Sequence, residues 1–145
     1  MSKQRLCKQL QALKHRCQTL SFFNEESKAK SAQTNRGAYA EAEARTYLQQ
    51  QGLSFICANY LCKGGEIDLV MLDAQGLIFV EVRHRKSNRY GSAAESVDNR
   101  KQHKLRHAAQ HYLQQHPHSG SCRFDVIAIT GSVTHSNIDW IKDAF

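Results

Sequence analysis

The sequence predicts an α/β fold in which helices cover both faces of a mixed β-sheet. Residues 53–84 contain three segments in which apolar and polar side chains alternate, with turn-forming residues between them, as in β-strands. Residues 37–51 and 98–116 instead have the three- and four-residue apolar spacing of amphipathic helices. A strand-like run at 122–130 and a short one at 137–141 follow, so strands and helices are interspersed in one domain.

The length and charge of the chain limit the classes of protein to which it can belong. Its 145 residues are typical of one domain with a substantial core, and no stretch approaches the roughly 18 apolar residues of a transmembrane helix. The net charge of +7 and pI of about 9.3 suggest an acidic partner, usually nucleic acid, otherwise an anionic membrane surface. Five cysteines without a CxxC motif argue against a disulfide framework or a structural zinc site. We therefore expect a protein of the reducing cytoplasm with no membrane partner.

Residues 1–35 are expected to form a basic extension, and the domain then spans residues 36–145. Apolar side chains recur in the extension at the spacing of one amphipathic helix, at Leu6, Leu10, Leu13, Cys17 and Leu20. The polar stretch 24–36 predicts a linker. Seven Lys or Arg against two Glu would let this arm contact phosphates or a membrane, but a docked helix or a solvated tail is favoured.

The helix predicted at residues 37–51 places an acidic side chain close to the core. Its buried side is expected to hold Ala40, Ala44, Tyr47 and Leu48. Gly52 should end the helix at the C′ position. Glu41 lies at the edge of the buried side, which makes it a candidate third acid; the favoured alternative is an exposed i,i+4 ion pair with Arg45.

Residues 66–72 and 77–84 flank a turn-type tetrad and are predicted to pair as an antiparallel hairpin. The numbers of opposed residues then sum to 149, giving Leu72–Leu77, Val70–Phe79, Asp68–Glu81 and Glu66–Arg83. Alternation assigns one wholly apolar face to Ile67, Leu69, Met71, Ile78, Val80 and Val82. The other face is apolar near the turn and charged at its far end.

Asp68 and Glu81 are the unusual pair, because like charges opposite each other on adjacent strands destabilise a sheet. A partly covered carboxylate pair needs a cation, a proton or a basic side chain beside it. One candidate is a divalent metal such as Mg²⁺, which takes one or two carboxylates together with waters and a substrate phosphate. The other is an ordinary ion-pair network with Arg83 and its neighbours.

The helix predicted at 98–116, with Asp98 as its N-cap, carries a cation at the start of its apolar stripe. The stripe consists of Lys101, Leu105, Ala108 and Tyr112. Lys101 would either reach the hairpin acids or keep its ammonium group in water. Three histidines at i, i+4 and i+8 of this helix are expected to form a solvated face and no metal site; they are His103, His107 and His111.

Residues 83–107 carry eight Lys or Arg and only two acidic residues, so a cationic surface should adjoin the acid pair. Carboxylates that hold a metal beside such a surface are the arrangement expected for attack on a phosphodiester. The cations expected to contact nucleic acid are Arg85, Lys86, Arg89, Arg100 and Lys104.

Three ordered blocks of the sequence resemble the YraN family of uncharacterised bacterial proteins. They are GGEIDLV at residues 64–70, FVEVRHR at 79–85 and RFDVIA at 123–128, and the resemblance extends over residues 37–145. That family in turn is similar to the archaeal Holliday-junction resolvases of the restriction-endonuclease-like superfamily, whose acidic motif is PD-(D/E)xK. The resemblance implies a restriction-endonuclease-like mixed β-sheet flanked by helices.

By this resemblance Asp68 and Glu81 would hold Mg²⁺ or Mn²⁺, with the Val82 carbonyl as a further ligand. Glu41 would help through a water molecule. The lysine of the motif, two residues after the second acid, is Arg83 here, and a guanidinium stays charged and accepts protons poorly. Arg83 would then hold a phosphate, and Lys101 would supply the missing amine from its helix.

The implied function is a metal-dependent endonuclease that acts on branched or otherwise structured DNA, with a homodimer as the candidate assembly. Because arginine at the lysine position is compatible with lost catalysis, the alternative is a non-catalytic nucleic-acid-binding module that retains the nuclease fold. A weaker alternative is a protein-interaction domain that uses the N-terminal helix.

Overall fold

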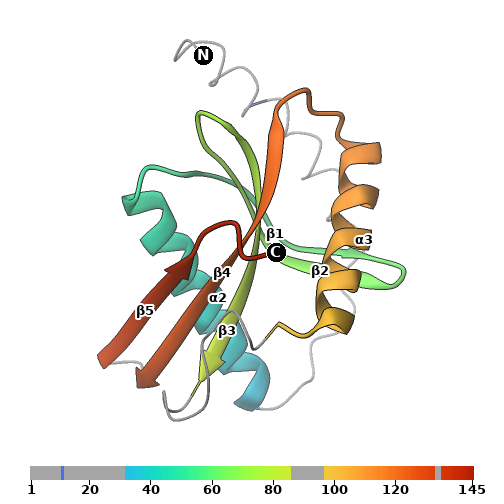
Figure 1. The fold of residues 1–145 in the computed structure, drawn as a ribbon. Coiled ribbons are helices and arrows are strands. Elements are labelled where there is room, and N and C mark those ends of the chain that lie inside the picture. The colour runs from blue at the N-terminus through green and yellow to red at the C-terminus, as the bar shows by residue number, and fades with distance from the viewer. Residues whose placement is uncertain (1–10, 12–31, 86–96, 133–134) are drawn as a thin grey trace.

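A five-stranded mixed sheet separates two layers of core, each covered by one helix (Figure 1). The computed structural model describes residues 11, 32–85, 97–132 and 135–145. In chain order its elements are α2 (Ala32–Gln50), β1 (Ser54–Cys62), β2 (Gly65–Leu72), β3 (Gly76–Arg85), α3 (Asn99–Gln115), β4 (Ser121–Ser132) and β5 (His135–Ile141). The strands keep this order across the sheet, and only β3 and β4 are parallel. The predicted α/β class is confirmed, and the layers are those of a restriction-endonuclease-like fold.

α2 begins earlier than predicted and ends as predicted. It starts at Ala32, so the predicted linker is wrong for residues 32–36, where Ala32, Gln33 and Arg36 have good helix propensity although Thr34 and Asn35 do not. At its end the Gly52 N–H donates to the Gln49 carbonyl and the Leu53 N–H to the Leu48 carbonyl, both at 3.0 Å. Gly52 has a φ of +91°, which a glycine adopts without strain. The rest of the predicted extension, except residue 11, lies outside the described residues.

α3 has the predicted N-cap and the predicted buried stripe. The Asp98 carboxylate accepts the Lys101 backbone N–H at 2.8 Å, which fixes the first turn of the helix. Leu105, Ala108 and Tyr112 are buried against the sheet. Lys101 therefore leaves the helix at a defined place, at the end of the face that packs on the strands.

Each face of the sheet packs under its own helix. Under α2 the core consists chiefly of Ala44, Leu48, Leu69, Met71, Ile78, Val80 and Ile127. Under α3 it consists chiefly of Val70, Leu72, Leu77, Phe79, Leu105, Tyr112 and Val126. The alternation of the two hairpin strands thus divides their apolar side chains between the layers, as predicted. Within the described residues no helix has the length and apolar character needed to cross a membrane.

The central hairpin has the predicted register near its turn but not at its far end. Leu72–Leu77, Met71–Ile78, Val70–Phe79 and Leu69–Val80 are opposed, and each pair of numbers sums to 149. Among the described residues the β2–β3 ladder stops there, so the predicted ladder pairs Asp68–Glu81 and Glu66–Arg83 are wrong. Glu66 lies opposite Leu61 of β1 instead.

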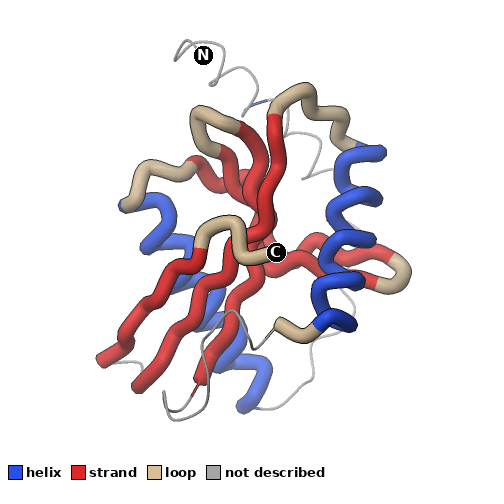
Figure 2. The backbone as a smooth tube through the Cα atoms, in the orientation of Figure 1, coloured by secondary structure: helices blue, strands red, loops and turns tan. Residues whose placement is uncertain are grey.

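Asp68 ends the ladder because its side chain takes a hydrogen bond that would otherwise belong to the sheet. Its Oδ2 accepts the Val82 N–H at 2.7 Å, where a strand carbonyl would normally lie. Beyond this point the β1–β2 ribbon turns toward α3 while β3 continues beside β4; we call this divergence the fork (Figure 2). A two-stranded ribbon twists more than a wide sheet, so Ile67 joins the core under α3 and not, as predicted, that of Leu69.

A buried charge network ties β4 to the β2–β3 turn and to the C-terminal residues. Fully buried Asp125 accepts hydrogen bonds from the Arg123 guanidinium, the Trp140 indole and the Asp143 backbone, each at 3.0 Å. The same guanidinium lies 2.8 Å from a carboxylate oxygen of Asp73 in the turn. Arg123 and Asp125, which belong to the sequence block RFDVIA at residues 123–128, therefore stabilise the fold.

Replacing Arg123 by methionine is expected to lower the free energy of unfolding by about 3–5 kcal/mol, because the Asp125 charge would stay buried without its cation. The matched change Asp73→Asn, at the partly exposed end of the same network, should cost only about 1 kcal/mol. Urea unfolding of both variants measures the difference. A loss below 1 kcal/mol in Arg123→Met would show that the network does not support the fold.

Candidate active site at the fork of the sheet

Asp68 of β2 and Glu81 of β3 meet at the fork. Both side chains are buried, with exposed fractions of 9% and 2%. They lie close enough for the negative charge of Asp68 to raise the pKa of Glu81. The strand ladder has ended at this point, so the Asp68–Val82 hydrogen bond, and not direct cross-strand pairing, holds Asp68 beside β3. The structure thus brings the two predicted acids together by a different route from the one expected.

Two cations approach Glu81 from different elements. The Lys101 ammonium, from the first turn of α3, lies 3.0 Å from Glu81 Oε2. The Arg83 guanidinium, from the same strand as Glu81, lies 3.6 Å from Oε1. Their side chains are 31% and 40% exposed, so both reach from the buried carboxylate to solvent. Lys101 therefore points to the acids, which was one of the two predicted alternatives.

The electrostatics of the site favour a bound positive charge. Burial raises the pKa of Glu81 to about 7, with a further contribution from the negative charge of Asp68. Lys101 and Arg83 lower the pKa of Glu81 without cancelling these effects. Burial likewise raises the pKa of Asp68, against the opposing influence of the Val82 N–H and Lys101. The two cations are thus insufficient to keep both carboxylates fully ionised near neutral pH.

The donor atoms at the fork fit a hard divalent cation. Buried Oε2 of Glu81 has the Lys101 ammonium at ion-pair distance, but no described residue gives it a hydrogen bond of good geometry. Mg²⁺ is commonly held by one or two carboxylates, with waters and substrate phosphates in the other positions. The described residues contain no group of three or more His, Cys, Asp or Glu arranged to hold a metal. A cation here would therefore complete its shell with water or substrate, and the Val82 carbonyl stays a predicted ligand.

Glu41 of α2 is close enough to the fork to interact electrostatically with Asp68. Burial raises the pKa of Glu41, and the charges of Asp68 and Glu66 act in the same direction, while a hydrogen bond with the Asn59 side chain opposes them. The favoured alternative, an ion pair with Arg45, is not among the ion pairs of the described residues. The Arg45 guanidinium instead lies 3.7 Å above the centre of the Phe55 ring.

Asn59 of β1 is a polar residue of this site that the sequence did not reveal. It lies between the pairs Ala58–Leu69 and Tyr60–Ile67, and therefore level with Asp68 across the ribbon. Its φ of +53° is a left-handed conformation, which asparagine tolerates better than most side chains. The only signal in the sequence was an asparagine within a strand, a position where this residue is depleted.

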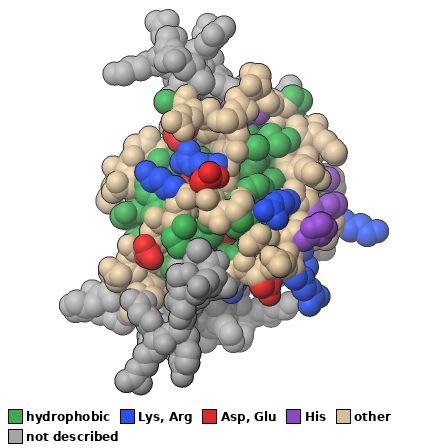
Figure 3. Space-filling view, viewed as in Figure 1, with side chains coloured by type: hydrophobic (Ala, Val, Ile, Leu, Met, Phe, Trp, Pro, Cys, Tyr) green, Lys and Arg blue, Asp and Glu red, His purple; other side chains and the backbone are tan. Residues whose placement is uncertain are grey.

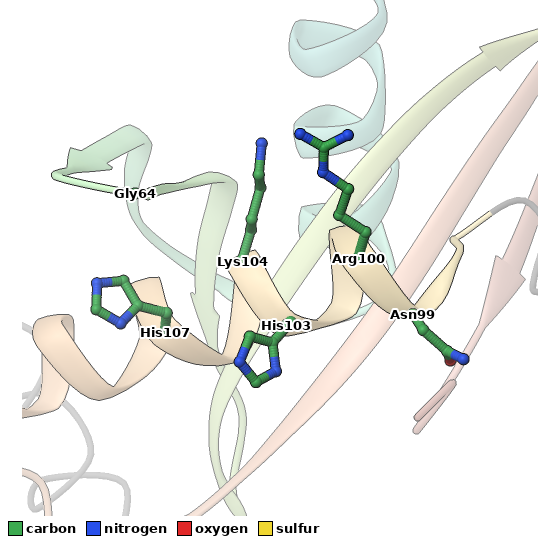
Figure 4. Close-up of a pocket in the computed structure, with 6 residues that line it drawn as sticks. All are labelled: Gly64, Asn99, Arg100, His103, Lys104 and His107. Carbon is green, nitrogen blue, oxygen red and sulfur yellow. The ribbon is translucent and has the colours of Figure 1, made fainter.

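The residues expected to contact nucleic acid divide into two groups. Arg100 and Lys104 line an open hollow on α3, shown in Figure 4. Lys86 and Arg89 lie outside the described residues, as does the side chain of Arg85. The structure therefore places only the helical part of the predicted cationic surface.

Comparisons with known proteins match most of the chain. The family model described as uncharacterised protein family UPF0102 matches residues 40–129. A UPF0102 protein of Pseudomonas putida GB-1 is 50% identical over 116 residues, which cover 77% of this chain and 94% of the relative. One of Pseudomonas savastanoi pv. phaseolicola is 52% identical, with 80% and 97% covered, and one of Psychromonas ingrahamii is 45% identical, with 79% and 92% covered.

Proposed function

This chain belongs to the uncharacterised protein family UPF0102, and we propose that it is a Mg²⁺- or Mn²⁺-dependent endonuclease that acts on branched or otherwise structured DNA. The observation that carries the proposal is the meeting of Asp68 and Glu81 at the fork, with Lys101 and Arg83 beside them. Buried paired carboxylates with raised pKa values are typical of functional sites. The net charge of +7 suits a polyanionic substrate.

Each side chain at the fork has a role in this proposal. Asp68 and Glu81 would hold the metal ion, which when bound would activate a water and offset charge on the phosphate. Asp68 is kept in place by the Val82 N–H, and Glu41 orients a water from the α2 side. Arg83 holds a phosphate oxygen as a permanent cation. Lys101 provides the amine that can exchange a proton with the reacting water or the leaving oxygen.

A cleavage assay tests the proposal. Duplex, flap and four-way-junction DNA are incubated with the full chain in Mg²⁺ or Mn²⁺ and compared with Asp68→Ala. Loss of a metal ligand should reduce cleavage at least about a thousandfold. The Asp68→Ala protein should also lose any metal-dependent rise in melting temperature. Equal cleavage by both proteins would contradict the proposed endonuclease activity. So would the absence of both cleavage and metal binding in the wild type.

A second candidate function is a non-catalytic nucleic-acid-binding module. It is favoured by one observation: Glu81 already has two cations within 4 Å, one of them the arginine at the lysine position of the motif. This module would bind nucleic acid with a strong salt dependence but with indifference to metal and to Asp68→Ala. Neutralising Arg85, Lys86 and Arg89 should abolish its binding.

The proposal includes a homodimer, because cutting two strands of a branched substrate symmetrically requires two sites. Light scattering of the full chain, alone and with a four-way junction, should give a mass of two copies. A single copy per junction at saturation would restrict the proposal to cleavage of one strand.

A further inference from the structure

An open hollow of about 620 Å³ lies beside α3 and has no role in the chemistry at the fork. Its lining comprises Gly64, Asn99, Arg100, His103, Lys104 and His107. In Figure 4 Arg100 and Lys104 extend side by side from the helix, and the two imidazoles leave it farther round. In the space-filling view, blue and purple side chains gather along the right side of the molecule, over α3 (Figure 3). The hollow is thus part of a basic surface.

Two glycines let the β1–β2 turn pack against α3 and form one wall of this hollow. A Cβ on Gly65 would lie 2.4 Å from the Lys104 carbonyl oxygen, so only glycine permits β2 to approach α3 so closely. Gly64 has a φ of +99°, which turns the chain back beside the helix. A ring nitrogen of His107 lies 3.1 Å from the Lys63 carbonyl and joins the turn to α3. The wall of the hollow is therefore held in place by packing.

No carboxylate among the described residues neutralises the positive charge of the hollow. Lys101 and Arg123 each have a carboxylate within ion-pair distance, whereas Arg100 and Lys104 have none among the described residues. The described side chains that line the hollow include no acid. The Arg100 guanidinium and the Lys104 ammonium are therefore charged donors with no carboxylate partner among the described residues, which suits an anion that offers several oxygens. His107 already has the Lys63 carbonyl as a partner and serves chiefly as part of the wall.

The position of the hollow relative to the fork identifies this anion. Lys101 contacts Glu81; on the same helix Arg100 directly precedes it, and Lys104 and His107 follow it. The helical residues that line the hollow run from Asn99 to His107, about 12 Å along the axis at 1.5 Å per residue, and Lys101 lies within this span. A nucleic acid strand that places one phosphate at the fork must continue past one side of it, and its flanking phosphates need cations there.

We propose that this hollow binds the sugar–phosphate backbone flanking the phosphate held at the fork, within a few nucleotides of it. The inference rests on the nucleic-acid partner of the proposed function and extends it to one side of the bound strand. Arg100 and Lys104 contact phosphate oxygens, and His103 and His107 border the same path. Contacts of this kind set the register of the strand without reading its bases.

The test uses full-length protein carrying Asp68→Ala in EDTA, so that binding is measured without cleavage. Its probe is a synthetic four-way DNA junction. In this background Arg100→Gln/Lys104→Gln should weaken binding at least about tenfold at 0.1 M salt. The slope of log K against log salt should fall by about one for each lost phosphate contact. The control Arg106→Gln/Lys142→Gln removes the same charge from cations that lie over Phe145 and Trp140, and should bind within about twofold of the parent.

Single neutral methylphosphonates placed along each strand locate the contact. The parent protein should lose affinity at a short run of phosphates on one side of the branch point, and the Arg100/Lys104 variant should be insensitive at the same positions. Equal weakening by the two double variants, an unchanged pattern of sensitive phosphates, or no binding of the junction by the parent would overturn the inference. Because binding is measured without cleavage, this result can be interpreted even if the cleavage assay shows that the protein is not a nuclease.

Discussion

Glu81→Gln is expected to stabilise the protein at pH 8 by up to about 3 kcal/mol while abolishing cleavage. The pKa of Glu81 in the folded protein is raised to about 7 from an ordinary 4.5, and each unit corresponds to about 1.4 kcal/mol. Because the folded-state pKa is raised, the stability linked to the protonated carboxyl is complete below pH 4.5. It is lost as the pH rises through 7. Glutamine imitates the protonated form and avoids that loss.

Urea unfolding of wild type and Glu81→Gln at several pH values in EDTA checks whether the substitution stabilises the protein as the pH rises. The difference in free energy of unfolding should be near zero at pH 4.5, grow up to pH 7 and stay constant above it. Asp139→Asn, an exposed carboxylate change on β5, should stay within about 0.5 kcal/mol of wild type throughout. A Glu81→Gln protein less stable than wild type at pH 8 would mean that the ion pairs outweigh the burial of this charge.

The same substitution separates stability from function. A neutral amide is a poorer ligand for a divalent cation than a carboxylate, so Glu81→Gln should lose the metal-dependent rise in melting temperature that we expect of wild type. Cleavage should fall by about a thousandfold or more. In the wild type the stabilisation by metal should be larger at pH 8 than at pH 6, because protons compete for the Glu81 carboxylate at the lower pH.

Lys101→Met is expected to lower kcat by about 10²–10⁴-fold, with a small change in KM. The size follows from the usual contribution of a positioned proton-transfer group. Its ammonium lies 3.0 Å from Glu81, and the arginine at the motif position cannot replace it because a guanidinium does not give up its proton at ordinary pH. Restoring the motif lysine with Arg83→Lys in the Lys101→Met background should recover part of the rate.

Lys104→Met is the matched control for Lys101→Met, since it removes an amine one turn along the same helix. This change in the hollow should raise KM and leave kcat within about threefold of wild type. If Lys101→Met cut as fast as wild type, or if Arg83→Lys brought no recovery to an impaired Lys101→Met protein, Lys101 would have no part in proton transfer. Its contact with Glu81 would then be an ordinary ion pair.

Local patterns were sufficient to predict the elements and much of the core. The turn-type tetrad between 66–72 and 77–84 gave the register of the hairpin near its turn, and the alternation of the two strands gave the face on which each side chain lies. Asp98 predicted the start of α3 and Gly52 the end of α2, since both positions need a specific side chain or backbone conformation. These features depend on residues that are neighbours in the chain, so the sequence alone is sufficient to predict them.

What the sequence by itself determined is that two acids on neighbouring strands and a cation on a following helix belong to one domain. Only the tertiary structure decided how they meet. The same alternation that predicted cross-strand pairing of Asp68 and Glu81 gave no sign that Asp68 would capture the Val82 N–H and end the ladder there. Asn59 and the hollow beside Arg100 and Lys104 were likewise hidden, because they depend on the close approach of β1, β2 and α3. Periodicity reports which side of an element is buried, whereas contacts between separate elements depend on packing that no local spacing encodes.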